Sequence, residues 1–162
     1  MLTTSITIRP HLAEYAQVIF AVEDENYIKI PHTHDLYHIL ANLMAKRPEN
    51  RPIHRGNLEI ALPAQSRGKC PIVYNYISDK SQKIIDQKIE CLFWAHAHEF
   101  VDNRYHMQGE QMKDAMYMFL QKYQIESISL DAIVKNYYRW RYEVRRKRFR
   151  RGYKKANIHR NG

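Results

Sequence analysis

The basic residues near the C-terminus are the part of this sequence whose types and spacing best suit chemistry. Residues 139–155 read Arg-Trp-Arg-Tyr-Glu-Val-Arg-Arg-Lys-Arg-Phe-Arg-Arg-Gly-Tyr-Lys-Lys, and ten of these seventeen are Lys or Arg. The whole chain carries 26 basic and 17 acidic side chains; once those ten and Arg160 are set aside, residues 1–138 hold 15 basic and 16 acidic ones. A nearly neutral chain thus ends in a strongly cationic segment, which indicates a polyanionic partner.

Aromatic side chains lie among these charges, at Trp140, Tyr142, Phe149 and Tyr153. Solvated, disordered tails are usually poor in aromatics. Rings beside guanidinium groups can instead pack on the protein or stack on bases, while Arg makes bidentate contacts with phosphate. Nucleic acid is therefore the predicted partner, and DNA the preferred one.

The expected nucleic-acid-binding residues fall into two groups. Contacts to base edges are expected from Lys135, Asn136, Tyr138 and Arg139, while Trp140 suits either base stacking or core packing. Contacts to phosphate, which position a protein without reading sequence, are expected mainly from Arg141, Arg145, Arg146, Lys147, Arg148, Arg150 and Arg151. Lys154 and Lys155 complete the set.

Other roles of a basic run are a solvated helix face, a localisation signal or a membrane-surface patch. The membrane suits it least, because an interfacial helix needs one broad apolar face. Between Arg145 and Lys155 only Phe149, Gly152 and Tyr153 are not basic. RNA is the main alternative partner, with the arginine-rich segment becoming ordered on it.

Six of the nine histidines fall into two groups that are candidates for a metal site. The first is His32, His34 and His38, and the second is His96, His98, Glu99 and His106. On one helix, residues two apart point about 200° away from each other, which suits a single metal poorly. No His-Glu-x-x-His or cysteine pair with zinc spacing is present. We therefore expect no metal or other cofactor, and keep a metal-dependent nuclease as the weaker alternative.

Length and composition favour an ordinary intracellular domain. The 162 residues contain no run of eighteen apolar residues, no secretory signal at the N-terminus, and two cysteines that match neither a metal site nor a disulfide framework. No Gly-x-Ser-x-Gly, Walker or dinucleotide-binding motif occurs. We expect a cytoplasmic protein that is not an enzyme and does not enter the membrane.

The first 76 residues are predicted to form a β-α-β-α-β unit. Strands are expected at residues 5–8, 27–30 and 57–62, with helices at about 11–20 and 34–47 between them. Pro10 presets the first turn of the first helix, and Thr33 is the expected cap of the second. Three short strands are stable only if helices cover one face of the sheet.

The second half is predicted to be helical. Helices are expected from residue 79 to about 101 after an N-cap at Ser78, at residues 110–123, and from Leu130 onward after an N-cap at Ser129. A helix, a short turn at residues 125–129 and a second helix ending in arginines resemble the helix-turn-helix DNA-binding unit in outline, over about residues 110–150. The resemblance implies that the second helix contacts DNA. The turn lacks the glycine often found in such units.

These patterns predict an α+β fold that is predominantly α. It comprises a three-stranded β/α piece (1–76), a helical part with a helix-turn-helix-like unit (77–144) and a basic C-terminal arm (145–162), in one compact domain. The expected function is sequence-specific or structural DNA binding in transcription or replication control, in a microbe or a phage-infected cell. A homodimer through strand edges of the N-terminal half would suit symmetric half-sites. A packaging protein that merely neutralises polyanions is a further alternative.

Overall fold

The computed structural model describes residues 1–53, 55–64 and 68–158, with side chains as far as residue 147. Within these ranges the chain forms five α-helices, one π-helical turn and two strands, so the fold is broadly α+β and mostly helical, as predicted. The helices are α1 (Pro10–Ile19), α2 (Asp35–Leu43), α3 (Asp79–Asp102), α4 (Met112–Lys122) and α5 (Leu130–Ile158). In the described part of the chain, no helix is both long and apolar enough to cross a bilayer.

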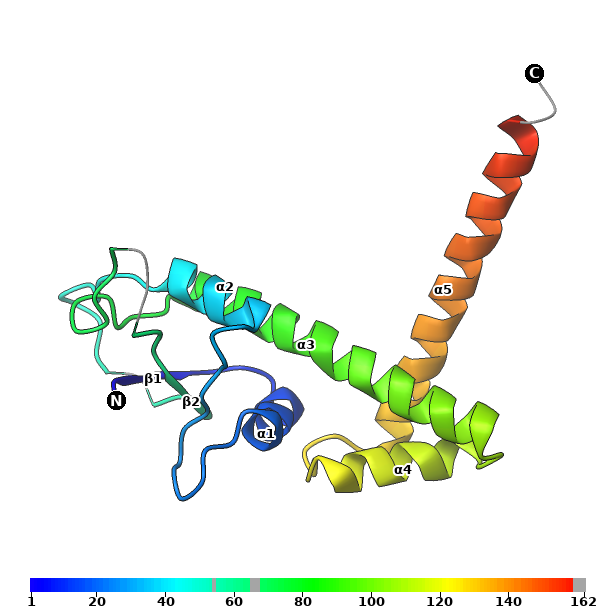
Figure 1. Ribbon diagram of the computed structural model, residues 1–162, viewed down its shortest axis with the longest axis horizontal. Helices are drawn as coiled ribbons and strands as arrows, with labels where there is room; N and C mark the ends of the chain where they lie inside the picture. Colours follow the sequence, from blue (N-terminus) through cyan, green and yellow to red (C-terminus); the bar gives the residue numbers. More distant parts are fainter. Residues whose placement is uncertain (54, 65–67, 159–162) are drawn as a thin grey trace.

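Helix α3 is the long central element of the body, which we define as residues 1–129. Helices α1 and α2 pack against it, α4 lies beside its C-terminal part, and α5 contacts it near that end and extends away from the body (Figure 1). The buried apolar residues form one cluster that reaches from Ile6 and Leu12 through Phe93 to Phe119 and Ile133. The start of α5 is therefore part of the same core as the N-terminal strands.

The sheet has two antiparallel strands, β1 (Thr3–Ile6) and β2 (Leu58–Ala61), with Thr3 opposite Ala61. The expected strand at residues 27–30 is wrong: it pairs with β2 only at Ile28, which faces Ile60 in a parallel bridge. The N–H of Ile28 donates to Glu59 and its carbonyl accepts from Ala61, both at 2.9 Å. Prolines at 31 and 63 follow closely in both segments and have no N–H to extend the ladder.

The ends of α2 are stabilised by side chains that differ from those predicted. Its N-cap is His34 rather than Thr33, and the His34 Nδ1 accepts from the N–H of Leu36 at 3.1 Å. At its C-terminus the Lys69 ammonium donates to the carbonyl of Asn42 at 2.6 Å and of Met44 at 2.8 Å. A cation at the carbonyl end of a helix is favoured by the helix dipole.

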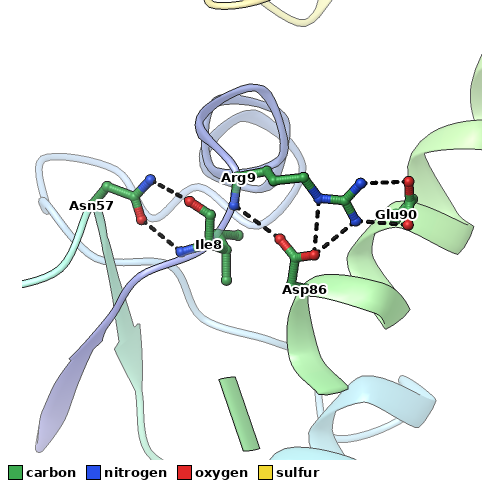
Figure 2. Close-up of polar contacts among 5 residues, drawn as sticks. All are labelled: Ile8, Arg9, Asn57, Asp86 and Glu90. Atoms are coloured by element: carbon green, nitrogen blue, oxygen red, sulfur yellow. Dashed lines mark hydrogen bonds and ion pairs between the residues drawn. The ribbon is translucent and has the colours of Figure 1, made fainter. Parts of the chain in front are cut away.

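A polar cluster fixes the junction between β1 and α1 on two sides (Figure 2). Ile8 donates its N–H to the side chain of Asn57 at 3.0 Å and accepts from it at 2.7 Å. The Arg9 guanidinium binds Asp86 at 2.7 Å and Glu90 at 2.6 Å, and its backbone N–H also donates to Asp86. Hydrogen bonding to Arg9 holds the pKa of Glu90 below its usual value. The start of α1 is thus joined to both the sheet and α3.

The helical half follows the prediction closely. Helix α3 begins after Ser78, whose Oγ accepts from the N–H of Ser81 at 3.2 Å. It continues into a π-helical turn, Asn103–Met107, where the connection to α4 was expected. Arg104 in this turn forms an ion pair with Glu110 at 2.8 Å.

Candidate nucleic-acid interface

The basic helix α5 is positioned by a well-defined end of α4. The N–H of Gln124 donates to the carbonyl of Gln121 at 3.2 Å, and the N–H of Ile125 donates to that of Leu120 at 2.9 Å. These two bonds form a Schellman motif, in which Gln124 adopts the left-handed conformation, with φ of 51°. Ile125 is buried directly after it. The chain therefore reverses direction here with a glutamine in the place that glycine usually occupies.

The connection between α4 and α5 is also attached to α1. One carboxylate oxygen of Glu14 accepts from the N–H groups of Glu126 at 3.0 Å and Ser127 at 3.1 Å, and from the Ser127 hydroxyl at 2.8 Å. Ser129 caps α5 as predicted, since its Oγ accepts from the N–H of Ala132 at 3.2 Å. The connection spans residues 123–129 and is longer than the three or four residues usual in helix-turn-helix units.

Aromatic stacking holds α5 against α3. The ring of His98 lies between Trp140, with centroids 3.2 Å apart and planes at 21°, and Trp94, at 5.6 Å and 24°. Tyr137 is fully buried, and its hydroxyl donates to Asp102 at 2.7 Å. Tyr137 therefore packs in the core. Trp140 stacks on the protein while 38% of its surface stays exposed.

His98 is an uncharged part of this stack at neutral pH. Its side chain is buried, and its Nε2 has no hydrogen-bond partner among the described residues. Burial lowers the pKa of His98 to about 4, although Asp102 nearby acts in the opposite direction. A neutral imidazole between two indoles makes this contact an apolar anchor rather than an ionic one.

Most of the α5 cations whose side chains are described are exposed, and none of them has a carboxylate partner among the described residues. Lys135, Arg139, Arg145, Arg146 and Lys147 are exposed, and Arg141 is half-buried. As far as the described side chains extend, none of these six forms an ion pair, whereas Arg9, Arg51, Arg104 and Lys113 of the body do. The positive charge of α5 is therefore available to an external anion.

Part of this charge forms a stripe on the side of α5 that faces away from the core. At about 100° per residue, Lys135, Arg139, Tyr142 and Arg146 share one side of the helix, roughly opposite Tyr137. Tyr142 is 67% exposed within this stripe. Cations interleaved with an exposed ring can bind phosphate and stack on a base.

The remaining predicted residues occupy different places on α5. Asn136 is half-buried, while Tyr138 is exposed. The backbone of α5 continues to Ile158. The side chains of Arg148, Arg150, Arg151, Lys154 and Lys155 lie outside the part of the structure that is described.

The histidines have individual roles in the fold. His34 caps α2, and His96 shares a 2.5 Å hydrogen bond through Nδ1 with the hydroxyl of buried Tyr15. His32, His38 and His106 are exposed. Across the described ranges, no three His, Cys, Asp or Glu side chains are grouped so as to hold a metal ion.

No protein-family model matches this chain, and no curated protein or solved structure is significantly similar to it. Its function must therefore be inferred from its own residues.

The sequence prediction considered His98 only as a metal ligand and missed that His98 and Trp94 stack with Trp140 and so hold α5 against α3. A usable signal was present, because two aromatic rings four residues apart on a helix lie on one face. That face needs an apolar partner, and Trp140 provides it.

Proposed function

We propose that this protein binds double-stranded DNA through α5, without catalysis, in a role such as transcription or replication control. The observation that carries the proposal is the exposure of the α5 cations at residues 135, 139 and 145–147, which form no ion pair with any described residue, in a chain whose residues 1–138 are almost neutral. Lys and Arg side chains release condensed counterions when they neutralise phosphates, which favours binding to a polyanion.

The arrangement of α4, the connecting turn and α5 supports a DNA-binding helix pair related in outline to helix-turn-helix units. α5 is capped at Ser129, anchored through Trp140 and basic beyond it. A rigidly held helix can present the same cations to each DNA site it meets. We place the protein in the cytoplasm, where bacterial and phage DNA is accessible.

The test compares two variants of the full chain. The basic-triplet variant carries Arg145→Gln, Arg146→Gln and Lys147→Gln; the α3 control variant carries Lys80→Gln, Lys83→Gln and Lys88→Gln, which removes the same charge from exposed positions of the body. In a fluorescence-anisotropy assay with a DNA duplex at fixed salt, we expect only the basic-triplet variant to lose at least about tenfold in affinity, in line with lost phosphate contacts. Equal losses in both variants would mean that net charge alone is responsible.

RNA is the second candidate, and the exposed rings of Tyr138 and Tyr142 favour it. Aromatic side chains stack on the splayed bases of RNA loops and single strands. A competition assay between a DNA duplex and a hairpin RNA at the same salt concentration separates the two candidates. Preferred binding of the hairpin would reject the DNA proposal.

A further inference from the structure

Helix α5 changes its surroundings at Trp140. The anchored half, residues 130–140, has one side packed on α3 and α4, as the burial of Ile133 and Tyr137 shows. The projecting half, residues 141–158, leads away from the body (Figure 1). The covered side of α5 continues past Trp140 only as half-burial of Arg141 and Val144, and residues 145–147 are exposed.

Cations of the projecting half point in several directions. Arg145, Arg146 and Lys147 are consecutive and all exposed. Because successive residues on an α-helix are about 100° apart, these three side chains span about 200° of the circumference. A flat anionic surface would contact one of these directions and leave the others unpaired.

A groove with phosphates on both walls matches such a distribution of charge. The major groove of B-DNA is about 12 Å wide, close to the 10–12 Å diameter of a helix with its side chains, while the minor groove is only about 6 Å wide. The major groove of duplex RNA is deep and too narrow for side chains to read. The projecting half is about 27 Å long at 1.5 Å per residue, less than the 34 Å of one DNA turn.

We propose that the projecting half of α5 lies in the major groove of DNA, with Arg145, Arg146 and Lys147 facing its floor and both phosphate walls. This inference rests on the proposed function. It differs from the sequence prediction, in which the base-reading residues lie in the anchored half. Here Lys135 and Arg139, on the outer side of the anchored half, contact phosphates at the edge of the groove.

The test uses dimethyl sulfate, which methylates guanine N7 in the major groove and adenine N3 in the minor groove. Full-length protein is bound to a mixed-sequence duplex at a saturation confirmed by anisotropy, and the ratio of N7 to N3 methylation is compared with that of free DNA. We expect the ratio to fall several-fold. The methylation ratio is taken over the whole duplex, so the assay works whether the protein binds one DNA sequence or many.

Two variants show which half of α5 causes the fall in the ratio of N7 to N3 methylation. At matched occupancy, the basic-triplet variant should restore the N7 to N3 ratio, whereas a variant with Lys135→Gln and Arg139→Gln should keep it low while binding more weakly. A duplex RNA of the same sequence should bind at least about tenfold more weakly, because its major groove is too narrow.

Failure of this inference is distinct from failure of the proposed function. DNA binding with unprotected N7, with protection of N3 instead, or with equal affinity for duplex RNA would overturn the major-groove placement and leave DNA binding intact. Absence of DNA binding by the unmodified protein would overturn both.

Discussion

Gly56 shows how closely the segment before β2 packs on β1. A Cβ atom at this position would lie 1.9 Å from the carbonyl oxygen of Ile6, a backbone atom that cannot move without disturbing the strand. The Gly56 N–H also donates to the hydroxyl of Ser5 at 2.7 Å. The absence of a side chain is thus a condition for the sheet to form as observed.

We therefore expect Gly56→Ala to lower the free energy of unfolding by about 3 kcal/mol, since the added methyl group must displace backbone. Urea denaturation followed by circular dichroism measures the change. Gly109→Ala is the matched control: Gly109 has φ of 69° but open space around it, so only the conformational cost of about 1 kcal/mol applies. A loss no larger at residue 56 than at residue 109 would contradict the packing described.

His98 makes stability depend on pH in a defined range. Its pKa is about 4 in the folded protein, against 6.5 when it is not buried. Between these values the unfolded chain binds more protons, so the contribution is complete above pH 6.5 and is lost as the pH falls towards 4. His98→Phe keeps a stacking ring that does not titrate. It should reduce the loss of stability between pH 7 and pH 4.5 by about 2 kcal/mol.

Urea denaturation of both proteins at the two pH values gives this difference directly. An unchanged pH dependence in His98→Phe would show that burial does not lower the pKa of His98 in the folded protein.

At the level of elements, the end of α4 determines where α5 starts. Gln124 is in the left-handed conformation, which costs a residue with a Cβ about 1 kcal/mol, yet both hydrogen bonds of the Schellman motif are formed. The bonds and the burial of Ile125 offset this cost.

Gln124→Gly should consequently raise the free energy of unfolding by about 0.5 to 1 kcal/mol, because glycine adopts this conformation without steric cost. Gln121→Gly, three residues earlier in the last turn of α4, should lower it by about 1 kcal/mol. Thermal and urea unfolding of the pair provide the comparison. Destabilisation by both substitutions would refute the role assigned to Gln124.

Helices were predictable from sequence to a greater degree than strands. The caps at Ser78 and Ser129 and the apolar stripes of α3 and α4 are local signals, and the structure confirms them. The segment around Ile28 alternates like a strand, but pairing depends on partners distant in sequence, and it is reduced to one bridge. The capping roles of His34 and Lys69 were both missed. Lys69 acts on a helix that ends about 25 residues before it, as its bond to Met44 shows.

The candidate site was predictable in composition but not in geometry. A count of charges was enough to locate the basic residues of α5. The stack of Trp140 on His98 joins positions more than 40 residues apart, and no local pattern specifies it. The division of α5 into an anchored and a projecting half follows from that contact and from the burial of Ile133 and Tyr137.

For the whole molecule, the separation of charge predicts a strong dependence of binding on salt. If six to eight cations of α5 contact phosphates, the logarithm of the DNA association constant should fall with that of the salt concentration at a slope of roughly −5 to −7. The basic-triplet variant should make the slope shallower by about 3, and the α3 control variant should leave it unchanged. Equilibrium titrations at four or more salt concentrations give the slopes. A slope near zero would exclude phosphate contacts as the source of affinity.

A homodimer through the N-terminal half stays a prediction of the sequence. Two copies would double the number of basic helices on one DNA molecule and suit symmetric half-sites. Light scattering at the concentration used for binding decides it, and a mass equal to one chain would contradict it.

The attachment of Glu14 to the α4–α5 connection has a mechanical consequence. The projecting half of α5 is about 27 Å long, so a tilt of about 10° where it leaves the body moves its far end by about 5 Å. That displacement exceeds the 3.4 Å step between neighbouring base pairs. In the proposed DNA complex, a single carboxylate on α1 would therefore help to determine which nucleotides α5 reaches.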